Sequence, residues 1–389
     1  MTYLKNDPIV IVAAKRTPIG NFLGCLSHLT APQLGAYAHK AALNQAGLLG
    51  DELDGVFYGC VLQAGIGQAP ARQSVILAEI PESVGALTIN KMCGSGMQSI
   101  MLAHDAIVAE TSQIMLAGGM ESMTQAPYLL KKARQGYRLG HNQILDHMFL
   151  DGLEDAYEKG KPMGHFAELT AKEFGFTREK QDEFALTSLN RAVEAVEKKY
   201  FTQEITPVEN IVQDEGIDPN KREKMTRLKP VFSQDGTITA ANASSISDGA
   251  ASLILMRLSE AEKRGIKPLA KIVAHATHAQ KPALFTTAPV EAIQKVLAKA
   301  KWTSDSVDLF EINEAFAIVT MAAMKQLKLP HEKVNVHGGA CVLGHPIGAS
   351  GARILITLLY ALKEHHLKRG VASLCIGGGE ATAMAIECC

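Results

Sequence analysis

The sequence has almost no net charge and no long apolar run. Its 389 residues include 39 Lys and Arg against 40 Asp and Glu, so the formal net charge is −1. A general binder of nucleic acid or of anionic membranes needs a basic excess, and the composition argues against both. No apolar window reaches the length of a membrane span, and no signal peptide precedes the apolar run that begins at Pro8. We therefore expect a cytoplasmic protein with no nucleic-acid or membrane partner.

Paired cysteines are also missing. The seven cysteines include no Cys-x-x-Cys pair, and their number is odd. A disulfide framework or a structural zinc site is therefore not expected, whereas a reducing compartment is. The cysteines are Cys25, Cys60, Cys93, Cys341, Cys375, Cys388 and Cys389.

The length and the apolar patterns predict an α/β protein with more than one domain. A chain of this length exceeds the size of a single hydrophobic core. Short apolar runs alternate with amphipathic stretches of helical spacing, which favours covered sheets. Strands are expected at 8–14, 112–120, 269–276, 307–312, 333–339 and 371–379, and helices at 29–47, 178–200 and 290–300.

Two parts of the chain repeat one pattern. In each, a glycine-rich loop opens a helix and a strand with a Gly-Gly pair follows, at 91–120 and again at 343–379. Two copies of one fold packed face to face would bring the two loops together. The polar block between them is read as an inserted cap or cofactor-binding subdomain. The predicted domains are 1–120 with 240–264 (N-terminal half), 121–239 (inserted domain) and 265–389 (C-terminal half).

Cys93 stands in the first loop, in the stretch NKMCGSGMQSI, where a helix is expected to begin. Free backbone N–H groups and the helix dipole at that point stabilise an anion, so we expect a lowered thiol pKa and more thiolate at neutral pH. The same N–H groups could hold an oxyanion after the sulfur attacks a carbonyl. The alternative is a buried structural cysteine.

Three further stretches carry residues suited to acid–base chemistry. His345 follows Gly344 on the second loop and can accept the thiol proton. Cys375 ends a buried strand before three glycines, where a second thiol can shuttle a proton. Asn313, in EINEAFA, either caps a helix or orients a water. Taken singly, His345 could be an ordinary loop histidine and Cys375 an inert strand cysteine.

Together these stretches resemble the thiolase family, in particular its acetyl-CoA C-acetyltransferase and 3-ketoacyl-CoA thiolase group. The resemblance covers essentially the whole chain. It implies the five-layered α-β-α-β-α thiolase fold, built from two similar halves with an inserted loop domain. The matching stretches, in order, are AAKRTPIG, NKMCGSGMQS, AGGMESMTQAPY, MGHFAE, TAANASSISDGAAS, NEAFA, GGACVLGHPIGASGARI and CIGGG.

The resemblance implies a role for each matching residue. Cys93 would be the nucleophile that carries the acyl group, and His345 the base that activates it. Cys375 would be the acid and base at the α-carbon of acetyl-CoA. Asn313, through a water, and His345 would form an oxyanion hole for the enolate. The backbone N–H groups of Cys93 and Gly377 would form a second one for the tetrahedral intermediate.

The resemblance also implies a site for coenzyme A (CoA). Ser244 matches a serine that contacts the pantetheine arm, and Met163 and Phe232 match residues that line the pocket. A basic cluster at 220–229 suits the nucleotide phosphates, or else is a solvated surface. The expected binding residues are Ser244, Arg222, Lys221, Met163, Phe232 and Phe285.

The intact catalytic set predicts an enzyme that condenses two acetyl-CoA into acetoacetyl-CoA and CoA by a ping-pong route, without a permanently bound cofactor. Two departures leave open a degradative 3-ketoacyl-CoA thiolase of broader chain length. Pro162 replaces a usual histidine, and FTTAP at 285–289 replaces a glycine-rich run. A decarboxylating ketoacyl synthase would lack Cys375, and a non-catalytic thiolase-like subunit would typically lack Cys93 or His345. No protease-type signature surrounds Cys93, which disfavours a cysteine hydrolase.

The segment 125–157 resembles the part of the thiolase loop domain that includes the tetramerisation loop. We therefore expect a homotetramer, as a dimer of dimers, with a homodimer as the alternative. The expected partners are acyl-CoA small molecules.

Overall fold

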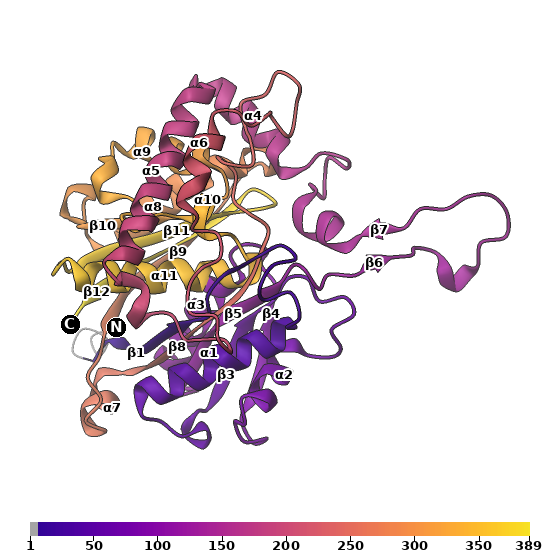
Figure 1. Ribbon diagram of the computed structural model, residues 1–389. Helices are drawn as coiled ribbons and strands as arrows, with labels where there is room; N and C mark the ends of the chain where they lie inside the picture. The colour runs from indigo at the N-terminus through magenta and orange to yellow at the C-terminus, as the bar shows by residue number, and fades with distance from the viewer. Residues whose placement is uncertain (1–6) are drawn as a thin grey trace.

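The computed structural model describes residues 7–389, so the first six residues of the predicted N-terminal half lie outside it. Within this range ten strands form one continuous mixed sheet (Figure 1). Its N-terminal part runs β1 (Ile9–Arg16), β8 (Ser247–Arg257), β5 (Met115–Ser122), β3 (Gly55–Gly59) and β4 (Gly85–Ile89), with β2 (Gly20–Asn21) beside β8. Its C-terminal part runs β9 (Ala270–Ala279), β12 (Glu380–Cys388), β11 (Arg369–Ile376) and β10 (Leu309–Ile312).

The two parts of the sheet have the same order and the same strand directions. In the first, β1 is antiparallel to β8, β8 to β5, and β5 is parallel to β3. In the second, β9 is antiparallel to β12, β12 to β11, and β11 is parallel to β10. The parts are joined where β1 pairs with β9 through two residue pairs, Val10 with Lys271 and Ile11 with Ala270. This shared topology confirms the predicted repeat of two similar halves.

The prediction of a strand at 333–339 is wrong. The counterpart of β4 in the second half is a single parallel bridge between Phe310 and Val334. Asn335 has a positive φ of 50°, which a strand does not allow. Its side chain bonds the backbone N–H and carbonyl of Ile312, at 2.8 Å each, and so takes the place of a ladder.

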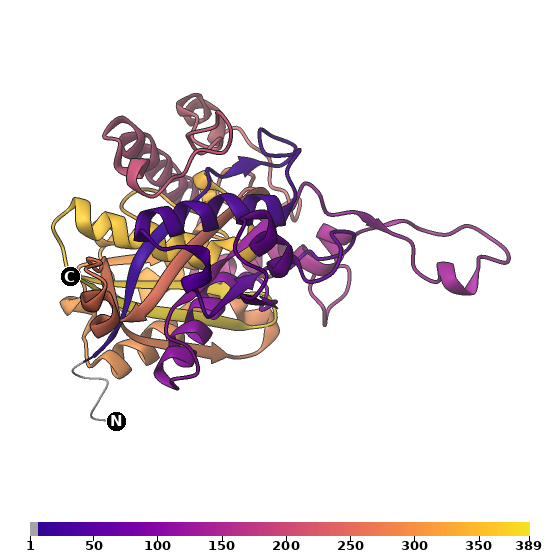
Figure 2. The ribbon, with the colours of Figure 1, turned by 90° about the horizontal axis from the view of Figure 1, so that it is seen from below.

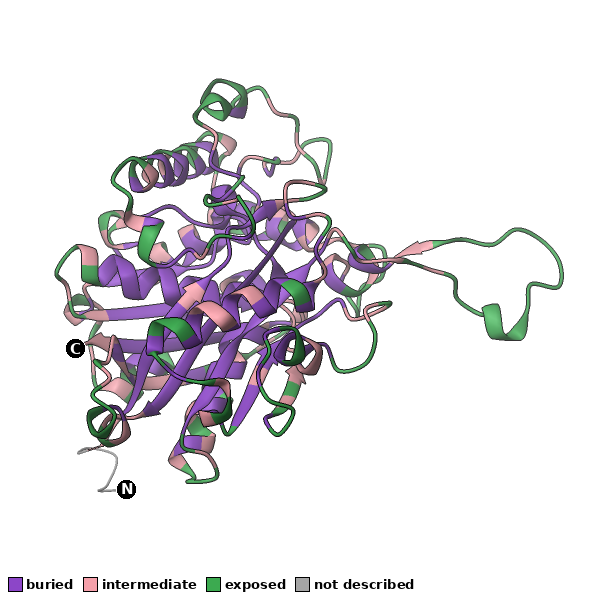
Figure 3. Cartoon of the chain, turned by 60° about the horizontal axis from the view of Figure 1, so that its bottom comes forward, coloured by how far each residue is buried: buried purple, intermediate pink, exposed green. Residues whose placement is uncertain are grey.

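The helices complete a five-layered arrangement, as expected. One core cluster joins the first helices to the outer face of the N-terminal part of the sheet. A second lies between the two parts, and a third lies on the outer face of the C-terminal part. The helix α11 (Ile347–Glu364) is mostly apolar and is buried along almost its whole length, as a helix that is covered on both sides must be. Figure 3 shows the central layers buried. The layers hold α1 (Ala31–Ala46) and α2 (Pro70–Leu77), then α3 (Ser95–Val108) and α11 (Ile347–Glu364), then α8 (Ala288–Ala300) and α9 (Ala317–Leu327).

Residues 121–239 carry helices above the sheets and an arm that projects from the body (Figures 1 and 2). The arm contains the two-stranded ribbon β6 (Tyr128–Leu129) and β7 (Leu145–Asp146). A buried ion cluster ties this part of the chain to β1, since Arg16 contacts Glu204 at 2.7 Å and Asp214 at 2.6 Å. The helices are α4 (Met163–Phe174), α5 (Arg178–Glu197) and α6 (Arg222–Met225).

Short elements complete the fold. None of the helices in residues 7–389 is both long enough and apolar enough to cross a membrane. The short elements are α7 (Leu258–Lys263), α10 (Ala340–Leu343), η2 (Gly50–Glu52), η3 (Ala133–Gln135), η4 (Phe149–Leu153), η5 (Tyr200–Gln203), η6 (Pro219–Lys221), η7 (Pro282–Thr287), η8 (Ser304–Ser306) and η9 (His331–Lys333).

Candidate active site

Glycines let the N-terminal ends of α3 and α11 approach closely. A Cβ atom added to Gly351 would lie 2.4 Å from the backbone nitrogen of Met97, and one added to Gly96 would lie 2.9 Å from that of Ala352. Both distances are shorter than real Cβ contacts, so only glycine fits at these positions. The approach brings the loop of Cys93 against the loop that opens α11, where the Cys93 side chain packs on a cluster that includes Ile347.

The Cys93 thiol lies just before α3 on a strained backbone. Met92, directly before it, has a φ of 47°, which is uncommon for a non-glycine residue and costs energy that the surrounding structure must offset. The backbone N–H groups of Gly377 and of Cys93 itself lower the pKa of the thiol. These are the two N–H groups that the family resemblance assigns to one oxyanion hole.

The expectation of a lowered Cys93 pKa is wrong. Burial raises the pKa of this thiol to about 11, and the two N–H groups offset only part of that rise. Loss of solvation therefore outweighs the effect of the helix N-terminus on this thiol. Cys93 is therefore a neutral thiol at neutral pH and needs a base to become a nucleophile.

Cys375, in β11, lies beside Cys93. Burial raises the pKa of Cys375 well above its ordinary value, and the neighbouring Cys93 raises it further. Two neutral thiols at one site thus depend on each other for ionisation, because a charge on either one disfavours a charge on the other.

The hydrogen bonds of His345 fix which of its ring nitrogens carries the proton. Ser350 Oγ donates to the Pro346 carbonyl at 2.9 Å and lies 2.5 Å from His345 Nδ1. Because the one hydroxyl proton is used on Pro346, Ser350 accepts from Nδ1–H, and the lone pair stays on Nε2. Burial and the positive charge of Arg353 lower the pKa of His345 to about 3. The ring is therefore neutral, with Nε2 as a free base.

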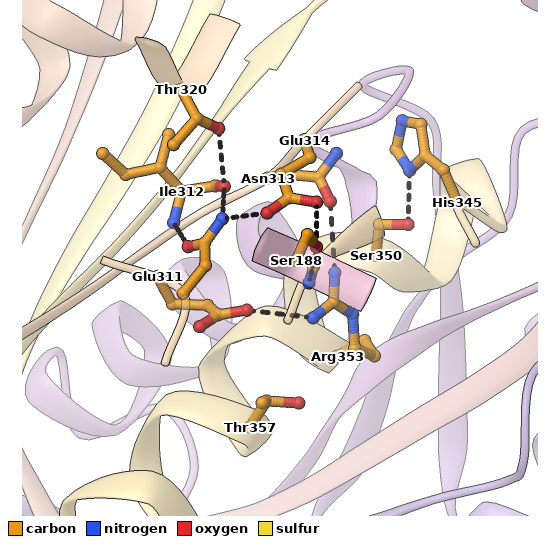
Figure 4. A network of polar contacts seen from close by, with 12 residues as sticks. Ser188, Glu311, Ile312, Asn313, Glu314, Thr320, His345, Ser350, Arg353 and Thr357 are labelled. Atoms are coloured by element: carbon orange, nitrogen blue, oxygen red, sulfur yellow. Dashed lines mark hydrogen bonds and ion pairs between the residues drawn. The ribbon is translucent and has the colours of Figure 1, made fainter. Parts of the chain in front are cut away.

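Asn313 is held by Arg353, which also forms a buried ion pair with Glu311. Arg353 donates to the Asn313 side-chain oxygen at 3.3 Å and to Glu311 at 3.1 Å (Figure 4). This orients the amide so that Nδ2 is the free end. The N-cap position of α9 is occupied by Phe316, so Asn313 is not the N-cap of this helix.

Three buried nitrogens of this network lack a hydrogen-bond partner among the described residues, one of them Arg353 Nε and the other two on predicted catalytic residues. These two are Asn313 Nδ2 and His345 Nε2. Figure 4 shows the free amide nitrogen of Asn313 on the side of the network that faces His345. Buried polar groups are rarely left unpaired, so such a pair is suited to a bound water or a substrate oxygen.

Three of the predicted substrate-binding residues gather at Cys375. Phe285 and Cys375 belong to one buried apolar cluster, and Met163 and Phe232 pack on it. The sulfur of Met163 lies 3.6 Å from the Cβ position of Gly377. The structure thus places an apolar wall next to the thiols.

The remaining binding residues lie on other elements. Ser244 donates its backbone N–H to Ala315 at 3.0 Å, two residues beyond Asn313. Lys221 and Arg222 lie at the start of α6, where Lys221 bonds the Gly216 carbonyl at 2.8 Å and Arg222 bonds a side chain of α5 at 2.8 Å. In this structure both basic side chains contact the protein itself.

Sequence reasoning missed the residues that support the site. Arg353 is the one charged residue between Ile347 and Leu362, and a lone charge in an apolar helix is a signal that could have identified it. Ser350 stands five positions after His345, a spacing that carries no such signal. The ion pair of Lys91 with Glu380, which joins the Cys93 loop to β12, depends on tertiary contact alone.

Comparison with known proteins gives a consistent result. The family described as thiolase, N-terminal domain, matches residues 9–259, and thiolase, C-terminal domain, matches residues 266–388. The chain is 46% identical to an acetyl-CoA acetyltransferase of Cupriavidus necator, over 97% of this chain and 99% of that protein. It is 46% identical to a probable acetyl-CoA acyltransferase of Staphylococcus aureus, over 97% and 98%.

A solved structure agrees. The crystal structure of the Bacillus anthracis acetyl-CoA acetyltransferase superposes with a TM-score of 0.95 at 40% identity, over 98% of this chain and 99% of that one. With both family domains matched in order and the fold shared over nearly the full length, the chain belongs to the thiolase family.

Proposed function

We propose that the protein is an acetyl-CoA C-acetyltransferase that reversibly joins two acetyl-CoA into acetoacetyl-CoA and free CoA. The observation that carries this proposal is the pair of adjacent thiols, half-buried Cys93 and buried Cys375, at a site with the unpartnered nitrogens of Asn313 and His345. The names of the C. necator and B. anthracis proteins support it. We also place the enzyme in the cytoplasm.

In the first half-reaction the acetyl group moves to Cys93. His345 Nε2 takes the thiol proton, and the sulfur attacks the thioester carbonyl. The resulting oxyanion accepts from the N–H groups of Cys93 and Gly377. The intermediate collapses, and the departing CoA sulfur takes the proton of Cys375. The products are free CoA, acetyl-Cys93, protonated His345 and the Cys375 thiolate.

In the second half-reaction a carbon–carbon bond forms. The Cys375 thiolate removes an α-proton from a second acetyl-CoA. The enolate oxygen accepts from protonated His345 Nε2–H and, through a water, from Asn313 Nδ2. The enolate carbon attacks the acetyl group of Cys93, and collapse expels the Cys93 thiolate, which recovers its proton from His345. All three groups regain their starting protonation.

The site residues supply this chemistry through fixed hydrogen-bond donors. An α-proton next to a thioester is a poor acid in water, so the enolate must be stabilised as it forms. One preorganised oxyanion donor is worth about 3–4 kcal/mol, and the site offers such donors at two places. The scheme uses CoA and acyl-CoA as substrates and assigns no step to a resident cofactor.

Thiolysis tests the reaction and the chain length. Purified protein is mixed with free CoA and either acetoacetyl-CoA or a medium-chain 3-ketoacyl-CoA, and loss of the 3-keto thioester is followed. We expect the shorter substrate to react faster, Cys93→Ala to be inactive, and Cys388→Ala, a matched half-buried cysteine, to be active. Faster cleavage of the longer substrate would instead assign the role of a degradative 3-ketoacyl-CoA thiolase. If folded protein cleaved neither substrate, the proposal that it is an enzyme would be refuted.

We propose that Lys221 and Arg222 contact the nucleotide phosphates of CoA after release of their present partners. Both lie in the basic segment 220–229, on the inserted block. Removing both charges should raise the KM for CoA and leave kcat unchanged, because the reacting atoms are untouched. An unchanged KM would mean that these residues are a solvated surface.

We further propose that the protein is a homotetramer held together by the arm. The arm exposes large apolar side chains, including Leu139 at 98% and Ile144 at 66%, which a lone subunit would leave in water. Light scattering should give the tetramer mass for the full chain and the dimer mass after residues 131–143 are replaced by a short glycine linker. A full-length dimer would contradict this assignment.

A further inference from the structure

Three metal-ligating side chains converge at the end of α3 that is remote from the thiols. His104 and Asp105 lie in the last turns of α3, and His275 lies in β9. Asp105 Oδ1 is 2.9 Å from His104 Nδ1 and 2.9 Å from His275 Nε2. All three ligand atoms lie within 4.8 Å of one another. The cluster is about 15 Å along the helix from Ser95, so the proposed reaction does not use it.

The donor set and its spacing suit a transition-metal ion. Two imidazole nitrogens and one carboxylate oxygen are ligands that Zn²⁺, Co²⁺ and Ni²⁺ accept. Bonds of about 2.0–2.1 Å at tetrahedral angles separate ligand atoms by about 3.3 Å. The two 2.9 Å contacts must therefore open by a few tenths of an ångström. Small side-chain rotations can supply this, since the Asp105 side chain is 55% exposed.

Two cationic side chains lie near the cluster and oppose a bound cation. Lys299 donates to the His275 carbonyl at 2.9 Å. Arg257 donates to the Ile107 carbonyl at the end of α3 at 3.0 Å. The proposal therefore depends on the convergence of the three ligand atoms.

We propose that His104, Asp105 and His275 bind one divalent transition-metal ion, which links the end of α3 to β9. Each histidine binds through the nitrogen that contacts Asp105, and the proton of that nitrogen moves to the other nitrogen of the same ring. Water completes the coordination. The ion joins a helix that begins next to Cys93 to a strand of the C-terminal sheet, so its effect is on stability. This inference does not depend on the proposed function.

Cobalt is a suitable probe, because its absorption spectrum reports the ligands. Protein freed of metal with a chelator is titrated with Co²⁺, and binding and thermal unfolding are measured. We expect one equivalent with ligand-field bands, without the near-ultraviolet bands of a thiolate ligand, and a raised Tm. His275→Asn and Asp105→Asn should each weaken binding by about 100-fold or more and remove the rise in Tm.

A matched control is available on the same strand. His278 lies three residues along β9 and bonds Gln280 instead of the cluster, so His278→Asn should bind Co²⁺ like the wild type. All three variants should keep the wild-type circular-dichroism spectrum, which shows that they fold. Binding that survives in His275→Asn, thiolate bands in the spectrum, or no stoichiometric binding by the wild type would each overturn the proposal, the last leaving a purely hydrogen-bonded triad.

Discussion

Replacing Ser350 by alanine tests the tautomer on which the acylation step depends. The hydroxyl holds the proton on His345 Nδ1 by accepting from it at 2.5 Å. In Ser350→Ala this buried N–H has no acceptor, and an unpaired buried group costs about 1–3 kcal/mol. That cost favours the tautomer with its proton on Nε2, where a water bound in the site can accept from it, and this tautomer cannot take the Cys93 proton. The fraction of competent enzyme should fall by about 5- to 150-fold.

Single-turnover acetylation measures this effect directly. Enzyme in excess is mixed with acetyl-CoA, and acetyl-Cys93 is quantified over time by mass spectrometry. Ser252→Ala is the matched control, since Ser252 Oγ lies 3.0 Å from Nδ1 of another buried histidine, His39, away from the thiols. Both variants should lose stability, but only Ser350→Ala should lose acetylation rate. Wild-type acetylation by folded Ser350→Ala would refute the tautomer argument.

Three further changes test the same structure. Alkylation of Cys93 by iodoacetamide should accelerate with pH toward the thiol pKa of about 11, and a plateau near pH 7 would contradict the neutral thiol. In Gly351→Ala the added Cβ would clash with the backbone of Met97, so the free energy of unfolding should fall by about 1–3 kcal/mol in denaturant titrations. In the control Gly85→Ala the Cβ meets open space, so no such loss from a clash is expected. Burial raises the pKa of Glu121 from 4.5 to about 7, so the fold favours its protonated form. The difference in pKa contributes on the order of 3 kcal/mol to the free energy of unfolding; this contribution is present below pH 4.5 and is lost as pH rises through 7. In Glu121→Gln the free energy of unfolding should no longer fall with pH over this range, as measured by denaturant titration.

The sequence predicted the layers and the residues that face each other across them. The repeated loop–helix–strand pattern required only that two like halves pack face to face. The strand at 333–339 could not be excluded in this way. Its apolar alternation is real, but the side chain of Asn335 bonds the backbone locally, and that competition depends on Ile312, which is distant in sequence.

Electrostatics were the least predictable part of the site. The position of Cys93 before a helix was read correctly, but the sign of its pKa shift depends on how deeply the thiol is buried, which no local pattern records. The effects of Ser350 on His345 and of Arg353 on Asn313 could not be predicted either, because they depend on the direction of hydrogen bonds that form only in the folded protein. Sequence motifs therefore indicate the reacting groups, while their protonation states depend on the assembled fold.

The placement of β8 has a consequence for how the chain is made. This strand lies between β1 and β5, yet it follows them only after the inserted block. During synthesis at about 5–20 residues per second, the 124 residues from 123 to 246 take roughly 6–25 s. Throughout that interval β1 and β5 lack their shared neighbour and leave open edges that can pair with other chains. The nascent chain is thus most vulnerable to aggregation before residue 257 emerges from the ribosome, and chaperone protection would be most valuable in that window.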